Sequence, residues 1–206
     1  IPSPQARQRE LPQEEPQTLK RSLEVEADVP ASALYKAYHM PGRFDSDFFA
    51  VDLMSDVLAR GQSSRLYQKL VKEKEIFTSL SSFTMATIDP GLLVINGRLK
   101  DGIKLKDAEA ELNELIGDFI DKGATEEELE KVKNQAYSTL EFGEVEVMNR
   151  AMNLAFAKLS GDAGYVNEEA RLIEAVNIDG VQRAAKQVLT EANSSVLYYK
   201  AKNQSA

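Results

Sequence analysis

Residues 61–79, GQSSRLYQKLVKEKEIFTS, contain the change of pattern that decides the fold. Ser63 or Ser64 can accept hydrogen bonds from the free N–H groups at the start of a helix. Apolar side chains one helical turn apart then follow on one face: Leu66, Tyr67, Leu70 and Val71. The charged run 72–75 ends that helix. From residue 76 to 87 the composition changes to Phe, Thr, Ser and Met without Gly or Pro, so the stretch predicts a short capped helix followed by a strand.

Two extended segments and a helix precede this hinge. Aliphatic and polar residues alternate from Leu19 to Ala27, which predicts a half-exposed strand. Residues 33–40 are more continuously apolar and predict a central strand. Asp45 or Ser46 can cap the next helix. The apolar residues of that helix predict packing through one face: Ala50, Leu53, Met54, Val57 and Leu58.

The remaining segments place strands next to one another and gather helices elsewhere. Asp89-Pro90-Gly91 predicts a turn, so residues 92–99 should form a hairpin with the strand before them. Residues 104–122 predict an amphipathic helix that Gly123 ends. Thr125 and Glu128 have the spacing of a capping box, which predicts the start of a long helix.

That long helix should bend or stop near Gly143 and resume to Gly161. Residues 164–174 and 179–189 predict two shorter helices, and residues 195–201 predict a final strand. This order indicates an α+β two-layer sandwich, with a mixed, largely antiparallel sheet and helices packed on one face.

The composition narrows the classes of function. The 206 residues have a net charge of −8 and no long Lys/Arg cluster, which argues against nucleic-acid binding. No apolar run approaches the roughly 20 residues that span a bilayer, so we expect no membrane insertion. Without cysteine there is neither a disulfide framework nor a thiolate metal site, and both cytoplasm and periplasm remain open.

The first residues differ in composition from the rest. Residues 1–17 hold four of the seven prolines and almost no side chains to bury, which predicts a linker with extended character, or alternatively a frayed terminus. We therefore expect a linker at residues 1–17 and one domain at residues 18–206. Since the chain starts at Ile1 without a signal segment, we expect it to be a piece of a longer polypeptide.

The hinge stretch resembles a motif of the pitrilysin/insulinase-type zinc metallopeptidases. The C-terminal halves of that family carry a pattern close to Gly-x-Ser-Ser-Arg-Leu-x-x-x-Leu-Arg, a charged turn and Gly-Leu-Ala-Tyr-Ser. The residues that match it are Gly61, Ser63, Ser64, Arg65, Leu66, Leu70 and Ser79. The resemblance extends to residues 123–129 and 178–199, and covers nearly the whole chain after Leu19. It implies the half-domain fold of the processing-peptidase type, similar to bacterial relatives of the mitochondrial processing peptidase. It also implies that the linker at residues 1–17 joins the two homologous halves of such a peptidase.

In this family the zinc lies in the N-terminal half, on an inverted His-x-x-Glu-His motif. The chain has one histidine, His39, with no second imidazole and no general-base Glu at helical spacing from it. A catalytic zinc ordinarily takes three protein ligands. We therefore expect His39 to be structural, no metal ligand or catalytic residue in this chain, and zinc in the N-terminal half or a partner subunit.

The family's C-terminal half normally adds an Arg and a Tyr to the peptide-binding chamber. Val71 and Thr78 stand at those two positions, and neither can replace the lost donor or the aromatic reach. Arg65 matches the motif, although an arginine near a helix start can instead bond neighbouring carboxylates. The resemblance leaves these chamber candidates: Arg65, Lys72, Thr78, Ser79, Ser81 and Ser82.

These observations imply the non-catalytic C-terminal half of a zinc metalloendopeptidase. It would form the wall of a peptide-binding chamber opposite a zinc-bearing half, with that homologous half or a paired subunit as partner and an unfolded peptide as substrate. The alternatives are a scaffold or assembly subunit of a degenerate family member, and a peptide-binding module without turnover.

Overall fold

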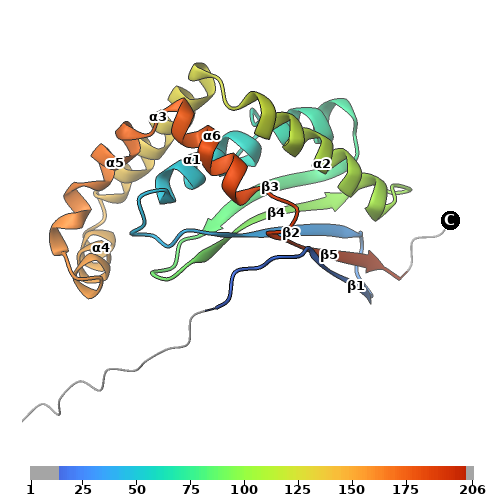
Figure 1. Cartoon of the computed structure of the whole chain (residues 1–206), viewed down its shortest axis with the longest axis horizontal. Helices are drawn as coiled ribbons and strands as arrows, with labels where there is room; N and C mark the ends of the chain where they lie inside the picture. The colour runs from blue at the N-terminus through green and yellow to red at the C-terminus, as the bar shows by residue number, and fades with distance from the viewer. Residues whose placement is uncertain (1–13, 203–206) are drawn as a thin grey trace, which may run out of the picture.

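The computed structural model describes residues 14–202, so most of the expected linker lies outside the described residues. Five strands form one sheet in the order β1-β5-β2-β4-β3 (Figure 1). Their bounds are Arg21–Ala27 for β1, Ala33–Met40 for β2, Phe77–Met85 for β3, Gly91–Leu99 for β4 and Ser194–Ala201 for β5. β1 and β5 are parallel, and all other neighbours are antiparallel. The central position predicted for the second strand and the predicted hairpin of β3 and β4 are confirmed. The first strand, predicted to be half-exposed, lies at the edge of the sheet, and none of its residues is buried.

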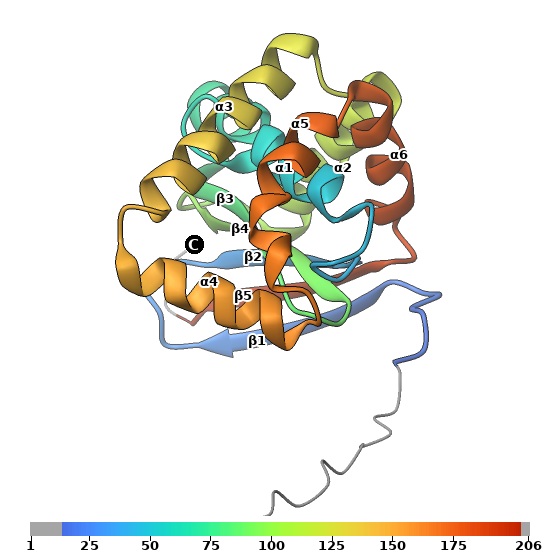
Figure 2. The ribbon, with the colours of Figure 1, turned by 90° about the vertical axis from the view of Figure 1, so that its left-hand side faces the viewer.

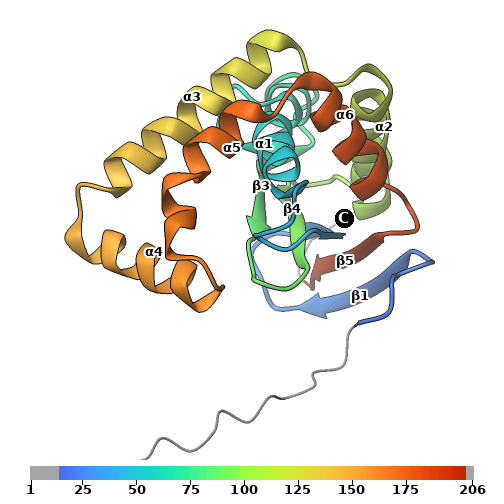
Figure 3. The same ribbon diagram turned by 60° about the vertical axis from the view of Figure 1, so that its left-hand side comes forward.

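Helices α1 (Phe48–Ala59), α2 (Leu105–Lys122) and α6 (Ile178–Val188) cover one face of this sheet (Figure 3). The apolar side of α2 lies in the core, and Gly123 ends that helix with a φ of 73°. The opposite face of the sheet has no helix over it within the described residues (Figure 1). The predicted α+β two-layer class is confirmed.

The sequence expectations for α1 were wrong in two respects. All α1 residues except Asp52 are buried, because α1 lies between β3 on one side and α3, α5 and α6 on the others. It therefore packs on all sides and not through one face. Neither Asp45 nor Ser46 caps it, since the helix begins after Asp47 without a side-chain cap, and the Asp45 carboxylate accepts a hydrogen bond from the Gly42 N–H at 2.8 Å.

Residues 126–175 form what we call the arm, which consists of α3 (Glu126–Gly143), α4 (Val147–Leu159), the 3-10 helix η2 (Ala163–Asn167) and α5 (Glu169–Ala175). The capping box at the start of α3 and the break after Gly143 are confirmed. The single helix predicted at residues 164–174 is instead η2 followed by α5. Figures 1 and 2 show α4 apart from the other helices, at the end of the sheet where β2 finishes.

The arm is attached to the loop between β2 and α1. Phe44 lies 4.7 Å from Tyr165 and 6.0 Å from Phe156, measured between ring centroids. Arg43 forms an ion pair with Glu169 at 2.6 Å. These contacts hold one side of α4, and every residue of α4 except Ala157 is exposed.

The first described residues are bound to the sheet. The side chain of Gln17 donates to the Ser194 carbonyl at 2.7 Å and accepts from the Ser195 hydroxyl at 3.1 Å. Among residues 14–202, no helix combines the length and apolar character needed to cross a membrane.

Candidate functional site

The hinge between residues 61 and 79 is a helix followed by a strand, as predicted, but the helix is unusual. Residues Tyr67–Glu73 form a π-helix, η1, in which the Lys74 N–H donates to the Lys69 carbonyl five residues earlier at 2.9 Å. The predicted serine cap is wrong, because the Ser64 hydroxyl donates to the Gly61 carbonyl at 2.7 Å and caps no N–H group. Such π-turns occur often at functional sites.

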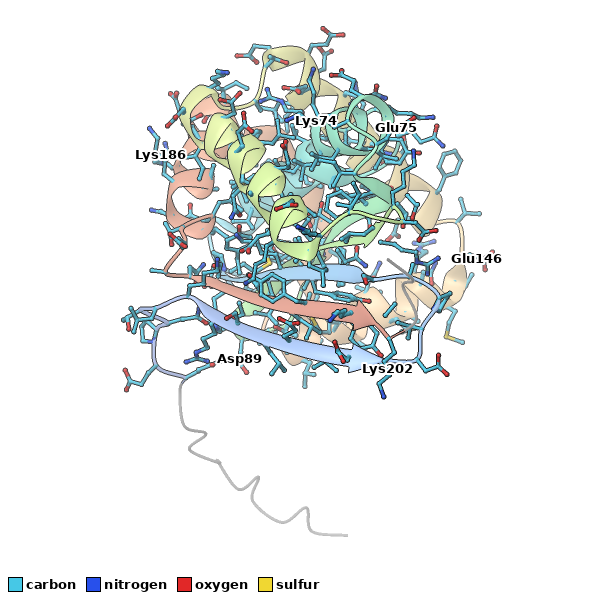
Figure 4. All side chains as sticks on the ribbon, turned by 90° about the vertical axis from the view of Figure 1, so that its right-hand side faces the viewer. Lys74, Glu75, Asp89, Glu146, Lys186 and Lys202 are labelled. Atoms are coloured by element: carbon cyan, nitrogen blue, oxygen red, sulfur yellow. The ribbon has the colours of Figure 1, made fainter. Side chains whose placement is uncertain are left out.

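Glu75 connects η1 to β3 in a left-handed conformation. Its φ of 52° is the only positive φ of a non-glycine residue in the part of the chain that the structure describes. Counting back from Ser79, residue 75 stands where the family pattern has its glycine, which adopts this conformation without strain. Figure 4 shows Lys74 and Glu75 at the surface, and Glu75 pairs with Lys100 at 2.6 Å.

Arg65 is directed into the helix layer. Its guanidinium donates two hydrogen bonds to the Glu128 carboxylate, both at 2.5 Å, and lies 5.1 Å from the centre of the Phe119 ring. Burial alone would raise the pKa of Glu128, but the hydrogen bonds from Arg65 and Thr125 outweigh it and the pKa is lowered. Arg65 thus links the start of the η1 helix to the capping box of α3.

The other chamber candidates lie at or near β3 and divide into two groups. Lys72, Thr78, Ser79 and Ser81 are exposed, whereas Ser82 is buried. The Ser82 hydroxyl donates to the Ser55 carbonyl of α1 at 2.7 Å and accepts from the Ser55 hydroxyl at 3.0 Å. Ser82 therefore belongs to the contact between α1 and the sheet.

Ser79 and Ser81 line a hollow of about 110 Å³ on the open face of the sheet. The Ser81 hydroxyl donates to the Asn96 side-chain oxygen at 2.6 Å. Three further polar residues of the hollow were not predicted from the sequence: Tyr35, Asn96 and Arg98. They come from strands β2 and β4, and only the two-residue alternation of those strands, combined with their pairing, could have placed them beside Ser81.

Strand register shows how the open face changes across the sheet. One row of paired residues crosses all five strands in the order Leu23, Leu197, Tyr35, Asn96 and Ser81. The row is apolar over β1 and β5 and polar over β4 and β3. The apolar end lies in a second, larger hollow of about 280 Å³.

The two substituted family positions lie in β3 or in the helix that contacts it. Val71 is half-buried and packs against the core. Thr78 lies in a β-bulge between Phe77 and Ser79, where it has no partner residue in β4, and its hydroxyl donates to the Arg98 carbonyl at 3.2 Å. An exposed hydroxyl is thus available at the Tyr position, but no cation at the Arg position.

Residues 14–202 contain no group of three or more His, Cys, Asp and Glu side chains that could hold a metal ion. His39 lies in β2, half-buried, and its carbonyl accepts a hydrogen bond from the Asn193 side chain at 2.9 Å. The geometry around it is that of a strand residue.

The buried Lys36 and Glu109 belong to a network between α2 and the sheet. Glu109 accepts from Lys20 at 2.7 Å and from the Tyr198 hydroxyl at 2.5 Å, and Lys36 lies 3.9 Å from it. Burial lowers the pKa of Lys36. Lys36 donates to Asn113 at 2.5 Å, so its polar group is satisfied and the network is structural.

The fold and the hinge motif agree with what known proteins show. The family model described as the peptidase M16 inactive domain matches residues 1–136. The chain belongs to this family. The resemblance to pitrilysin/insulinase-type metallopeptidases is thereby confirmed, and the chain is an M16 domain of the inactive type. No protein of curated function matches the sequence.

Solved structures share the M16 fold. A protease from Helicobacter pylori is 20% identical, with a TM-score of 0.88 over 96% of this chain and 48% of that protein. An inactive peptidase domain from Bordetella parapertussis is 25% identical, with a TM-score of 0.78 over 88% of this chain and 96% of that one. The periplasmic protease PqqL from Escherichia coli is 18% identical, with a TM-score of 0.75 over 98% of this chain and 22% of PqqL. This chain therefore spans about half the length of the Helicobacter pylori protein.

Proposed function

We propose that this M16 domain forms the wall of a peptide-binding chamber opposite a zinc-bearing half, and that it does not itself cleave peptides. The observation that carries the proposal is the β3 edge of the sheet. Among the described residues β3 has a strand partner on one side only. An edge strand offers unpaired N–H and C=O groups, to which an extended peptide can add as a further strand.

The side chains beside this edge suit a peptide. Lys72, Thr78, Ser79 and Ser81 are exposed there. Asn96 and Arg98 line the adjoining hollow, and no ion pair of Arg98 is formed within residues 14–202. Hydroxyl, amide and guanidinium groups bind peptide carbonyls and acidic side chains. Extended, unfolded peptides are therefore the proposed substrate class.

Cleavage would depend on residues outside the described part of this chain. A zinc centre with three protein ligands and a bound water polarises a peptide carbonyl and supplies the attacking water. We place this centre in the N-terminal half or in a paired subunit. The length of the Helicobacter pylori relative, about twice that of the matched region, supports a partner half on the same polypeptide.

A scaffold role without proteolysis is the second candidate. It is favoured by Val71, which offers no hydrogen-bond donor where the family has its arginine. The two candidates differ in whether the β3 edge binds a peptide.

The experiment is fluorescence anisotropy of the purified chain with a labelled, unstructured peptide rich in acidic residues. We expect saturable binding that Arg98→Glu weakens at least fivefold. Lys186→Glu makes the same charge change on α6, on another side of the molecule (Figure 4), and should leave binding unaltered. Binding that is absent, or equally reduced by both variants, favours the scaffold.

The same preparation is tested for zinc content and for cleavage of the peptide with and without a chelator. We expect substoichiometric zinc and an intact peptide. Chelator-sensitive proteolysis by this chain alone would end the proposal that it is non-catalytic.

A further inference from the structure

Residues 14–30, which we call the N-terminal segment, are attached to the domain without entering its core. None of them is buried, and Leu19 and Leu23 expose 76% and 62% of their surface. Among the described strands, β1 pairs with β5 alone, at the edge of the sheet (Figure 3). Ser32 is the first buried residue of the described chain. Segments with few buried contacts and exposed backbone hydrogen bonds are the ones that open locally.

Two side chains tie this segment to the rest of the domain. Gln17 donates to the Ala192 and Ser194 carbonyls in the turn before β5, at 3.1 and 2.7 Å. Lys20 reaches the helix layer, where its ammonium donates to the Glu109 carboxylate of α2 at 2.7 Å. Glu109 is 5% exposed, so solvent screens this ion pair less than a pair at the surface. The contact between Lys20 and Glu109 should therefore be the strongest side-chain attachment of the segment.

Glu109 has a second cation beside it. The ammonium of Lys36, a β2 residue that is 3% exposed, lies 3.9 Å from the same carboxylate and donates to the Asn113 side chain. Burial lowers the pKa of Lys36, and the charge of Lys20 acts in the same direction. The Tyr198 hydroxyl also donates to Glu109, at 2.5 Å. Two ammonium groups thus share one buried carboxylate.

This arrangement lowers the free-energy cost of releasing Lys20. A buried carboxylate that loses its only cation destabilises a protein strongly, because an uncompensated charge stays buried. Glu109 avoids that penalty, since Lys36 and the Tyr198 hydroxyl remain beside it when Lys20 leaves. Lys36 at the same time loses a neighbour of like charge. The carboxylate is therefore compensated both with the segment attached and with the segment released, so both states are accessible to one molecule.

We propose that the N-terminal segment is a strap that dissociates from β5 and α2 as one unit while the rest of the domain stays folded, with Lys36 replacing Lys20 as the cation of Glu109. Release moves the first fixed point of the described chain from Gln17 to Ser32. The freed residues between these two points can extend to roughly 50 Å.

Release of the strap changes the reach of whatever is attached before it. For a partner half on the same polypeptide, a consequence that rests on the proposed function, the strap controls how far the two halves can separate. The strap itself depends neither on peptide binding nor on zinc. It is therefore tested on this chain alone, and its failure would leave the proposed function standing.

Hydrogen exchange of the whole chain, followed by mass spectrometry, measures the release. The β1 amides that pairing with β5 protects are compared with those of β4 in the same sample, so a variant that destabilises the entire fold accelerates both. We expect β1 to exchange faster than β4 by roughly 100-fold or more. Lys20→Met removes a charge-assisted hydrogen bond, and should accelerate exchange in β1 by roughly tenfold or more while leaving β4 unchanged.

Two further lysine variants separate the strap from an ordinary ion pair. Lys200→Met is the matched control, because it removes an exposed pair with Glu26 in the same two strands. Exchange in β1 should then change by less than about threefold. Lys36→Met removes the replacement cation, so that release would leave a buried carboxylate without a positive charge. Exchange in β1 should therefore slow by roughly threefold or more relative to β4.

Spin-label distances test the geometry independently, because the chain has no native cysteine. Leu19→Cys and Asp118→Cys place labels at exposed positions on the segment and on α2. Double electron–electron resonance should show a narrow distance for the attached segment and a broad distribution for the released one. Lys20→Met should enlarge the broad population, and so should Glu109→Gln, which removes the carboxylate that both lysines share. Lys36→Met should reduce it.

Three outcomes would overturn the proposal. One is exchange in β1 as slow as in β4. Another is an equal response to Lys20→Met and Lys200→Met, since the buried pair would then hold the segment no better than the exposed one. The third is faster exchange in β1 relative to β4 for Lys36→Met, because Lys36 would then help to hold the strap and not to release it.

Discussion

Helices α1 and α4 have 12 and 13 residues, yet all but Asp52 of α1 are buried, whereas Ala157 is the only buried residue of α4. Both sequences carry apolar residues at helical spacing. The difference arises from position, since α1 lies between the sheet and three helices while α4 lies beyond the end of the sheet. An apolar stripe thus predicts a helix, but the rest of the fold decides whether the stripe is covered. Two leucines, one on each helix, provide the sharpest test.

Leu58→Ala on α1 should lower the free energy of unfolding by about 3 kcal/mol, because Leu58 is fully buried and its loss leaves a cavity. Leu159→Ala on α4 removes the same atoms from a side chain that is 77% exposed and should cost less than about 0.5 kcal/mol. Urea denaturation measures both. Equal losses would contradict the separation of α4 from the core.

Asp56 tests the cost of burying α1 on all sides. Burial raises the pKa of its carboxyl to about 6, although Arg60 pairs with it at 2.7 Å. A folded pKa above the unfolded value of about 3.9 means that the protonated group favours the folded state. Its stabilising contribution is complete below pH 4 and is lost as pH rises through about 6.

Asp56→Asn removes this titration. We expect the free energy of unfolding at pH 7 to rise by about 2 kcal/mol, below the roughly 3 kcal/mol that a shift of two pKa units represents, since Arg60 loses its partner. Below pH 4 the variant should have no advantage. Urea midpoints measured from pH 4 to 7 follow the difference, and a gain that is independent of pH would show that Asp56 titrates normally.

Much of the fold could be predicted from the sequence, but less of the candidate site. The capping box of Thr125 and Glu128, the break at Gly143 and the change of pattern at Ile76 depend on residues close together in the chain, so local rules found them. The π-helix was not foreseen, because Leu66 and Leu70 fit an ordinary helix equally well. The serine and aspartate caps were wrong because Ser64 and Asp45 bond to other backbone groups in their own turns.

The residues that share the open face of the sheet could not be predicted from any one segment of the sequence. Tyr35, Asn96 and Ser81 lie side by side because β4 lies between β2 and β3, and no segment of sequence states that order. Arg65 was found through the family motif, but its partner Glu128 is 63 residues away, on another helix. Long-range pairing therefore determined which predicted residues reach the open face.

The smallest expected effects come from two backbone positions, Glu75 before β3 and Gly143 at the end of α3. Glu75, between the π-helix and β3, has a left-handed φ that glycine adopts without strain. Glu75→Gly should therefore raise the free energy of unfolding by about 0.5–1 kcal/mol, despite losing an exposed pair with Lys100.

Gly143 ends α3 at the corner of the arm, where an added Cβ meets nothing within 4 Å. Gly143→Ala should therefore stabilise by up to about 0.5 kcal/mol through helix propensity. Thermal unfolding measures both, with Gly61→Ala as the control, since its φ of 77° predicts destabilisation in equally open space. If Gly143→Ala raised the melting temperature while Glu75→Gly lowered it, the left-handed strain at Glu75 would be outweighed by its ion pair, and the hinge would tolerate glutamate for its charge.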